Sequence, residues 1–132
     1  MAPVSKHLGI WIDRSAVEVY DYVSQPANLA EWAAGLGSSI ELIGGQWVAE
    51  SPLGQVVVAM AEPNPYGVLD HWVTLATGER FYNPMRVIAD GDRCELVFTL
   101  RRQPGVSDAD FDRDAVAVAA DLAAAKRLLE SR

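Results

Sequence analysis

An apolar strand that runs directly into two short capped helices most constrains the fold of this chain. The segment from Ile10 to Gly35 reads IWIDRSAVEVYDYVSQPANLAEWAAG. Ser15 and Glu18 have the S-x-x-E spacing of a capping box, and the apolar residues that follow recur at the spacing of one buried helix face. Pro26 is favoured at the start of a second helix, and Gly35 supplies a C-terminal stop. The segment therefore predicts a strand followed by a helical hairpin.

The middle of the chain alternates apolar stretches with turn residues, as is typical of an antiparallel meander. The expected strands span residues 39–43, 46–50, 55–61, 68–76, 79–89 and 93–100. Thr77-Gly78 and Asp90-Gly91-Asp92 are two of the turns between them. Because the turns are short, the pattern excludes βαβ units, whose crossovers need a helix.

The last segment, from Ser107 to Glu130, is predicted to form one long helix. Acidic residues crowd its first turns while Lys126 and Arg127 lie near its end, which matches the helix dipole. Its apolar stripe consists of Phe111, Ala115, Val118, Leu122, Ala125 and Leu129. Much of the remainder is alanine, so the helix either packs closely on the sheet or leaves a cavity beneath it.

Three parts of the sequence together carry a resemblance: IDRSAVEVYDYVSQPANLAEW, the turn-separated strands and the closing helix. They resemble the START-like superfamily of helix-grip domains, also called SRPBCC or polyketide cyclase/dehydrase-like. The resemblance covers nearly the whole chain, so residues 1–132 are expected to form a single domain. It implies an α+β fold in which a curved antiparallel sheet of about six or seven strands wraps around the C-terminal helix. This superfamily includes lipid carriers, hormone receptors and cyclases, so the fold does not decide the function.

Composition excludes several other classes of protein. The net charge is −7 and the pI is about 4.7, which disfavours nucleic-acid binding. Cys94 is the only cysteine and the two histidines are far apart, so neither a disulfide nor a metal centre is expected. The sequence also lacks phosphate-binding glycine motifs, and we expect no cofactor. The N-terminal MAPVSK lacks the apolar core of a signal peptide and no segment suits a membrane helix, so a cytoplasmic protein is expected.

Period-two alternation assigns the faces of the strands. Val73 and Leu75 belong to a buried set, which places His71 on the same face and Asp70 on the other. An Asp70–His71 dyad is therefore not expected. In the last strand, the inward set consists of Cys94, Leu96, Phe98 and Leu100, and its hairpin partners include Met85.

Across the hairpin that turns at Thr77-Gly78, the alternation of inward and outward side chains is inconsistent. A two-residue turn at Thr77-Gly78 would place Tyr82 opposite Val73, which is out of phase with Met85. A bulge at Asn83-Pro84 would shift the phase by one residue, since proline within a ladder is found at edges or bulges. Tyr82 and Met85 are then both expected to face inward.

These assignments predict one apolar cavity beneath the closing helix. Its expected apolar lining consists of Trp32, Trp47, Met85, Leu96, Phe98, Phe111, Val118 and Leu122. His71 and Tyr82 are the expected polar groups and the candidate catalytic residues, although His71 could equally be a core histidine bonded to a neighbouring strand or helix. Arg86 is a further ligand-binding candidate, but alternation favours an outward side chain.

The sequence favours a carrier or sensor of a small apolar or aromatic molecule, because one cavity with few polar groups suits binding better than catalysis. The resemblance also implies an alternative, a polyketide cyclase, aromatase or dehydrase-like enzyme that uses His71 and Tyr82. A protein-interaction module with a collapsed cavity is a second alternative. No membrane or nucleic-acid partner is expected, and a homodimer stays open.

Overall fold

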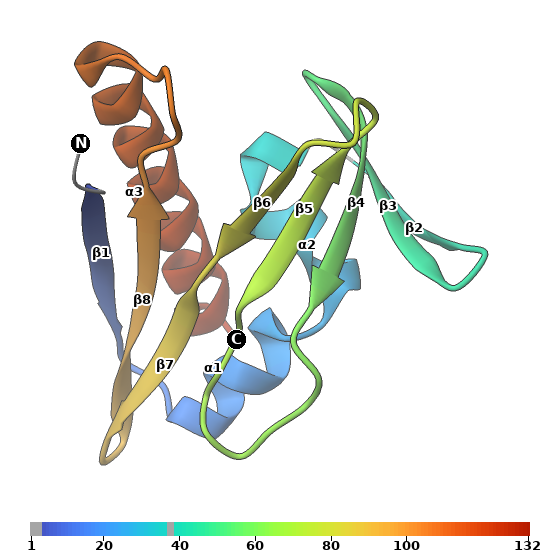
Figure 1. Ribbon diagram of the computed structural model, residues 1–132. Helices are drawn as coiled ribbons and strands as arrows, with labels where there is room; N and C mark the ends of the chain where they lie inside the picture. The colour runs from blue at the N-terminus through green and yellow to red at the C-terminus, as the bar shows by residue number, and fades with distance from the viewer. Residues whose placement is uncertain (1–3, 37–38) are drawn as a thin grey trace.

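The computed structural model describes residues 4–36 and 39–132, which form an α+β fold with a long C-terminal helix (Figure 1). The elements are, in order, β1 (Ser5–Ile12), α1 (Ala16–Val23), η1 (Pro26–Asn28), α2 (Leu29–Trp32), η2 (Ala34–Leu36), β2 (Ile40–Ile43), β3 (Gln46–Ser51), β4 (Gly54–Met60), β5 (His71–Leu75), β6 (Arg80–Asn83), β7 (Met85–Asp90), β8 (Arg93–Arg101) and α3 (Asp108–Glu130). This order confirms the predicted strand, helical hairpin, meander and closing helix. None of the helices in the described part of the chain is long and apolar enough to cross a membrane.

The strands form two antiparallel sheets that meet at Pro84. One sheet has the order β1-β8-β7 and the other has the order β2-β3-β4-β5-β6. Pro84 separates β6 from β7, yet its carbonyl still accepts a hydrogen bond of 2.9 Å from Thr99 N–H of β8. The segment before β5 also pairs with β7, since Leu69 N–H donates to Met85 O at 2.9 Å. The two sheets are therefore joined by a bend at Pro84. Together, β6 and β7 correspond to the single strand expected over residues 79–89.

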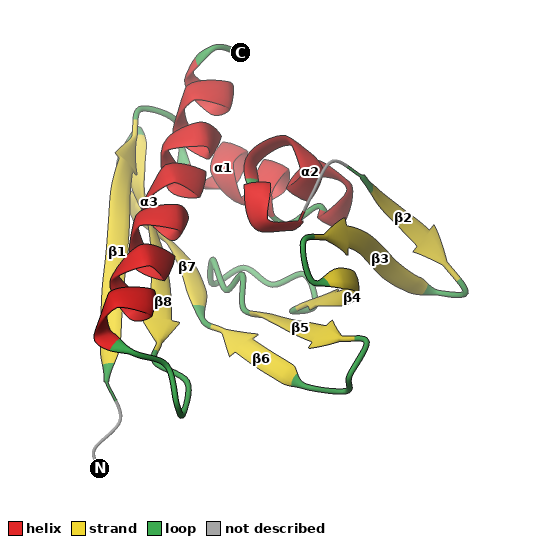
Figure 2. Cartoon of the chain, turned by 90° about the horizontal axis from the view of Figure 1, so that it is seen from above, coloured by secondary structure: helices red, strands yellow, loops and turns green. Residues whose placement is uncertain are grey.

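Both capped helices begin where the sequence predicts. The Ser15 hydroxyl accepts a hydrogen bond from Glu18 N–H at 3.2 Å, and the Ser107 hydroxyl accepts one from Asp110 N–H at 3.1 Å. Pro26 opens the short η1 helix. Figure 2 shows α3 running along β1 and β8, with α1 and α2 on the same side of the sheets. The long helix thus lies on the inner, concave side, as the helix-grip fold requires.

The turn between β5 and β6 differs from the prediction. Leu75 N–H donates to Glu79 O, so the loop has three residues and ends on Gly78, whose φ is +94°. This loop moves the register by one residue, and Tyr82 lies opposite Trp72 instead of Val73. The predicted phase shift at Asn83-Pro84 is therefore wrong. Alternation continues through Pro84, with Asn83 and Met85 on the inner face.

The apolar core lies between the sheets and the helices. Its largest fully buried side chains include Ile12, Leu29, Met85, Leu96 and Leu122. They come from the first strand, the helical hairpin, the β7–β8 ladder and α3, so each part of the fold contributes to one core. Packing is not complete at the end where β5 and β6 diverge from α3, and a cavity lies there.

Candidate functional site

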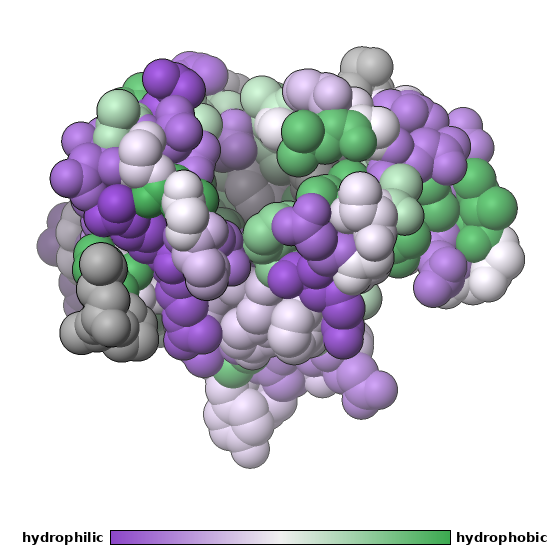
Figure 3. Space-filling model, turned by 45° about the horizontal axis from the view of Figure 1, so that its top comes forward, coloured by the Kyte–Doolittle hydropathy of each residue, from purple (hydrophilic) through white to green (hydrophobic). Residues whose placement is uncertain are grey.

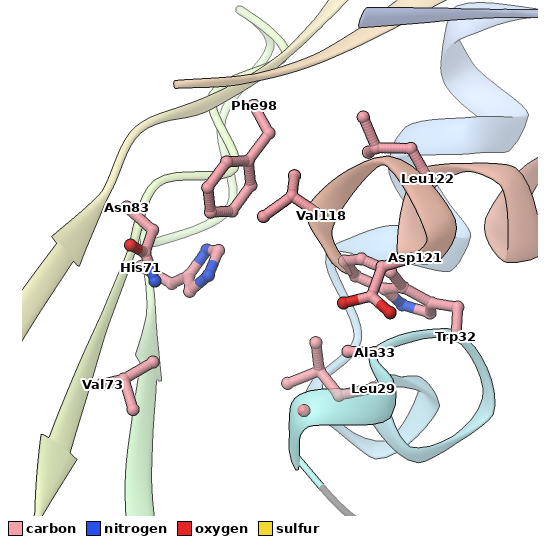
Figure 4. A pocket seen from close by; sticks show the side chains of 11 residues that line it. Leu29, Trp32, Ala33, His71, Val73, Asn83, Phe98, Val118, Asp121 and Leu122 are labelled. Atoms are coloured by element: carbon pink, nitrogen blue, oxygen red, sulfur yellow. The ribbon is translucent and has the colours of Figure 1, made fainter. Parts of the chain in front are cut away.

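A pocket of about 210 Å³ lies between α2, α3 and the inner face of the β5–β6 hairpin (Figure 4). Its lining consists of Leu29, Trp32, Ala33, Gly35, His71, Val73, Asn83, Phe98, Val118, Asp121 and Leu122. We call it the inner pocket. Most of its surface is apolar, and its polar groups are few. It therefore has the character of a small-molecule site, in which a few polar groups orient a largely apolar ligand.

The inner pocket opens into a wider groove of about 660 Å³ that leads to the surface. We call it the outer groove. The two share residues including Val73, Asn83, Phe98 and Asp121. The groove is bordered by α3, by the loop before it and by the tips of the β3–β4 and β5–β6 hairpins, and Figure 3 shows the molecule hollowed at this end. A ligand longer than the inner pocket would extend into this groove.

His71 is the first residue of β5 and lines the inner pocket, with only 6% of its surface exposed. Its Nδ1 lies 3.1 Å from the carbonyl oxygen of Leu69, and because a carbonyl only accepts, Nδ1 carries the proton. Burial lowers the pKa of His71, opposed by that hydrogen bond and by the negative charge of Asp70. The ring is therefore neutral near pH 7, with a lone pair free on Nε2.

Asn83 ends β6 directly across from His71 in the strand register. The two side chains share the inner face and both line the inner pocket (Figure 4). Directly opposed residues of antiparallel strands have Cβ atoms about 4.5–5.5 Å apart, within reach of a shared ligand. Among the described residues, none forms a hydrogen bond with the Asn83 amide. This amide is consequently available to a bound molecule.

Asp121 projects from α3 into the same pocket and is the one acidic residue among the described residues that line it. Its Oδ1 accepts a hydrogen bond from Ala34 N–H at 3.1 Å, which ties α3 to the segment after α2. Burial raises the pKa of Asp121, and the hydrogen bond from Ala34 opposes this shift. The pocket thus holds an acid whose pKa is raised and a base whose pKa is lowered.

Trp32 forms part of the pocket wall at the end of α2. Its indole Nε1–H is buried and has no hydrogen-bond partner among the described residues. An unpaired buried donor costs about 1–3 kcal/mol, so most such groups in folded proteins are satisfied. The buried indole N–H is thus an unpaired donor in the pocket wall, next to a pocket that also contains the unused hydrogen-bonding groups of His71 and Asn83.

Tyr82 does not belong to this site, and the prediction that it faces the cavity is wrong. Because the three-residue turn places it opposite Trp72, it lies on the outer face of the hairpin. There its ring packs against Trp72 with centroids 4.8 Å apart. Its hydroxyl donates to Asp70, which also accepts from Arg86 and, at 2.9 Å, from Met85 N–H. We call Asp70, Tyr82 and Arg86 the outer cluster.

Charge in the outer cluster is well compensated. Burial alone would raise the pKa of Asp70, but the hydrogen bonds from Tyr82, Met85 and Arg86 together lower it below its usual value. The hydrogen bond to Asp70 in turn raises the pKa of Tyr82. Arg86 is directed outward, as alternation favours, and forms an ion pair with Asp70 instead of reaching the cavity. No Asp70–His71 hydrogen bond forms, since the two side chains lie on opposite faces.

The remaining predicted lining residues divide among several places. Trp32, Phe98, Val118 and Leu122 line the inner pocket, and Phe111 lines the outer groove. Met85 and Leu96 are instead fully buried in the core, because the β7–β8 ladder is covered by helices. Trp47 lies in a separate hollow between β4 and α1, because the β2–β3 hairpin turns away from α3.

Sequence reasoning missed Asp121 and Asn83. Asp121 follows Val118 by three residues, so the helical period places it at the edge of the stripe that faces the sheet. An acid at such a position is a recognisable signal. Asn83 could be placed only by the register across the β5–β6 turn, and the two-residue turn gave the wrong register.

Metal and thiol chemistry find no support in the described part of the chain. No group of three or more His, Cys, Asp or Glu side chains there is arranged to hold a metal ion. Cys94 is fully buried in β8, and burial raises the pKa of its thiol. A buried neutral thiol is a poor nucleophile, so Cys94 has a packing role.

Comparison with solved structures identifies the fold. A conserved protein from Geobacillus kaustophilus has a TM-score of 0.77 at 12% identity, covering 97% of this chain and 96% of that one. Ara h 8.0201 has a TM-score of 0.74 at 11% identity, covering 99% and 100%. The ZhuI aromatase/cyclase from Streptomyces sp. R1128 has a TM-score of 0.72 at 15% identity, covering 99% and 96%. No protein-family profile and no curated protein matches the sequence.

The chain therefore has the START-like helix-grip fold, as its sequence indicated. Structures with this fold include an aromatase/cyclase, and in this chain the inner pocket lies under α3. Identities of 11–15% establish the fold and leave the function to the residues of the site.

Proposed function

We propose that this protein binds a small, largely apolar molecule in the inner pocket, as a carrier or sensor. The observation that supports the proposal is the pocket itself, an apolar space of about 210 Å³ that is continuous with an open groove. Engineered apolar cavities of about 150 Å³ take up benzene, so a space of this size suits one or two fused rings. The groove provides the entry path and room for a substituent.

The test compares two valines of α3 that differ only in where they point. Val118 lines the inner pocket, whereas Val116 is 70% exposed on the opposite side of the helix. The neutral dye N-phenyl-1-naphthylamine should bind the native protein in a saturable way with enhanced fluorescence. Val118→Trp fills the pocket and should weaken binding by about tenfold or more, the equivalent of at least 1.4 kcal/mol. Val116→Trp should leave it unchanged.

Two results would overturn the proposal. One is dye binding that does not saturate, and the other is an equal effect of the two tryptophan substitutions. Circular dichroism and the thermal midpoint of each variant check that the fold is retained. Mass spectrometry of the freshly purified protein under native conditions would additionally reveal a bound molecule.

Enzymatic proton transfer is a second candidate function, favoured by the pairing of His71 with Asp121 in one pocket. Burial moves the pKa of Asp121 up and that of His71 down, which brings the two values closer together. A neutral imidazole can accept a proton as a general base, and a carboxyl group whose pKa is raised is better able to donate one. This pairing replaces His71 and Tyr82 as the catalytic candidates, and the ZhuI aromatase/cyclase shares the fold.

Proton exchange at the carbon next to a ketone tests this candidate. 2-Tetralone is a neutral bicyclic ketone, and its exchange of hydrogen for deuterium in D₂O can be followed by NMR. For an enzyme, the protein should accelerate exchange, and His71→Gln should lower the accelerated rate by about 10²-fold, the usual scale for a lost general base. Equal rates with the native protein and with His71→Gln would leave only the binding function. A cytoplasmic location, expected from the sequence, is also part of the proposal, and whether the chain forms a homodimer stays open.

A further inference from the structure

We infer that the inner pocket recognises a hydroxyl group on a neutral aromatic ring, which His71 and Asn83 bind together. The hydroxyl donates its proton to His71 Nε2, and its oxygen accepts from the Asn83 amide. This inference rests on the proposed binding function and specifies the chemical class of the ligand. It assigns a ligand contact to Asn83 and the role of a neutral acceptor to His71.

The hydrogen bond at Nδ1 determines what His71 can offer. Because Leu69 O holds the proton on Nδ1, the neutral ring presents Nε2 as an acceptor. Among the described residues, none donates a hydrogen bond to Nε2. Figure 4 shows the ring directed into the pocket beside Phe98, with ring centroids 6.1 Å apart. A ligand therefore needs a donor to satisfy this nitrogen.

Asn83 supplies the complementary group. It is the cross-strand partner of His71, so its amide and the imidazole lie side by side on the inner face. A side-chain amide has two N–H donors and an acceptor oxygen, whereas a hydroxyl both donates and accepts. One hydroxyl between the two residues can therefore complete a hydrogen bond with each. An ether or a hydrocarbon cannot satisfy the imidazole.

Charge in the pocket argues against an acidic ligand. Of the described residues that line the inner pocket, only Asp121 carries a carboxylate and none is a Lys or Arg. A ligand carboxylate there would face a like charge in a poorly solvated space with no cation to offset it. Arg101 and Arg102 border only the outer groove. The group bound at His71 is therefore neutral.

A set of matched naphthalene probes tests the inference in competition with N-phenyl-1-naphthylamine. 2-Naphthol carries the hydroxyl, 2-methoxynaphthalene keeps only the acceptor oxygen, naphthalene has neither, and 2-naphthoate is an anion. We expect 2-naphthol to bind about tenfold more tightly than naphthalene, as one net hydrogen bond allows. The methoxy compound should bind no better than naphthalene, and the naphthoate should bind most weakly.

Two pocket variants and one control locate the effect. His71→Leu and Asn83→Leu should each reduce the preference for 2-naphthol over naphthalene to less than about threefold, while naphthalene still binds. Tyr82→Phe, next to Asn83 but on the outer face, should retain the full preference. The ¹⁵N resonance of His71 Nε2 should move when 2-naphthol is added and stay in place with 2-methoxynaphthalene, which tests the contact without any substitution.

The outcomes separate the two proposals. If naphthalene and the dye fail to bind at all, the binding function itself is wrong. If they bind but 2-naphthol shows no advantage, or keeps it in both leucine variants, the hydroxyl inference alone is wrong. An Nε2 resonance that does not respond to 2-naphthol would also overturn it.

Discussion

The β5–β6 hairpin presents polar residues on both faces, but the protein supplies hydrogen-bond partners mainly to those on the outer face. On the outer face, the Asp70 carboxylate accepts hydrogen bonds from Tyr82, Arg86 and Met85 N–H. On the inner face, His71 has only the bond at Nδ1, and the Asn83 amide has none among the described residues. Asp70 and His71 are adjacent in sequence and similarly buried, at 8% and 6% exposure.

Burial of a polar group therefore does not by itself identify a functional site. A buried polar group whose partners are all supplied by the protein contributes to stability and has nothing left to bind a ligand. A buried polar group with an unused donor or acceptor costs stability unless a ligand completes it. The outer cluster is of the first kind and the inner pocket is of the second. Measurements of stability and of binding can distinguish the two kinds of group.

The largest expected effect is from Asp70→Ala on the outer face. The substitution leaves the buried Met85 N–H without an acceptor and removes the partner of Tyr82 and Arg86. We expect a loss of about 3 kcal/mol in the free energy of unfolding, measured by urea denaturation at pH 7. Dye affinity of the folded variant should be unchanged, because the cluster lies outside the pocket.

Asp90→Ala is the matched control for this measurement. Asp90 pairs with Arg93 at 3.6 Å in an exposed turn, with more than half of each side chain accessible to solvent. Exposed ion pairs contribute little, so its loss should cost less than about 0.5 kcal/mol. If both variants lose the same small amount, the outer cluster has no special role in stability.

The outer cluster also shows which features of the structure the sequence predicts and which it does not. Capping at Ser15 and Ser107, the closing helix and the inward position of His71 follow from local patterns that the structure retains. The position of Tyr82 does not, because it depends on a turn whose sequence, Ala76-Thr77-Gly78-Glu79, suits a loop of either two or three residues. A slip of one residue transfers every side chain of β6 to the other face.

Pocket residues are harder to predict than core residues for a related reason. Met85 and Leu96 have the same alternation as Phe98, and only the path of the helices decides which of them borders a cavity. Asn83 becomes a neighbour of His71 through the register of the β5–β6 hairpin, and Asp121 reaches the same pocket through tertiary packing. Sequence periodicity assigns a face, but the unfilled volume on that face depends on the curvature of the whole sheet.

Tyr82→Phe should have the second largest effect on stability. It removes the hydroxyl that donates to Asp70 but keeps the ring that packs on Trp72. Hydrogen bonds to charged groups contribute about 1.5–3 kcal/mol, and the partial exposure of Tyr82 favours the lower end, so we expect a loss of about 1.5 kcal/mol. Thermal and urea unfolding would measure it. A loss of the preference for 2-naphthol over naphthalene in this variant as large as that in His71→Leu would contradict the assignment of Tyr82 to the outer face.

A smaller effect is expected from pH through His71. Its folded pKa lies below the unfolded value of 6.5, so the unfolded chain binds the proton first as pH falls. The free energy of unfolding has its full value while the ring is neutral in both states, above pH 6.5. It decreases as pH falls toward the folded pKa of His71. Relative to His71→Leu, the native protein should lose up to about 1 kcal/mol between pH 7 and pH 5.5.

Asp70 provides the internal contrast for this pH measurement. Its folded pKa is lowered, so its contribution is complete above its unfolded value of 3.8 and declines only in more acidic solution. Plotted against pH, the free energies of unfolding of the native protein and of His71→Leu should therefore diverge between pH 7 and pH 5.5. Below the folded pKa of His71, the difference between them should stay constant. Parallel pH profiles for the two proteins across that window would show that His71 is not held neutral by the fold.

Apart from the Asp90→Ala control, the smallest predicted change is a gain in stability from Asp121→Asn on the inner face. Asparagine keeps the oxygen that accepts from Ala34 N–H and removes a charge that burial disfavours. Because the folded pKa of Asp121 is raised above 3.8, the ionised carboxylate costs stability at neutral pH, and this cost disappears as pH falls below 3.8. We expect a gain of about 0.5 kcal/mol at pH 7 and none at pH 3. The same variant should bind 2-naphthoate more tightly, because the like charge has gone. A loss of stability at pH 7 would mean that Asp121 is satisfied by its surroundings, as Asp70 is, and the contrast between the two faces would then hold for His71 and Asn83 alone.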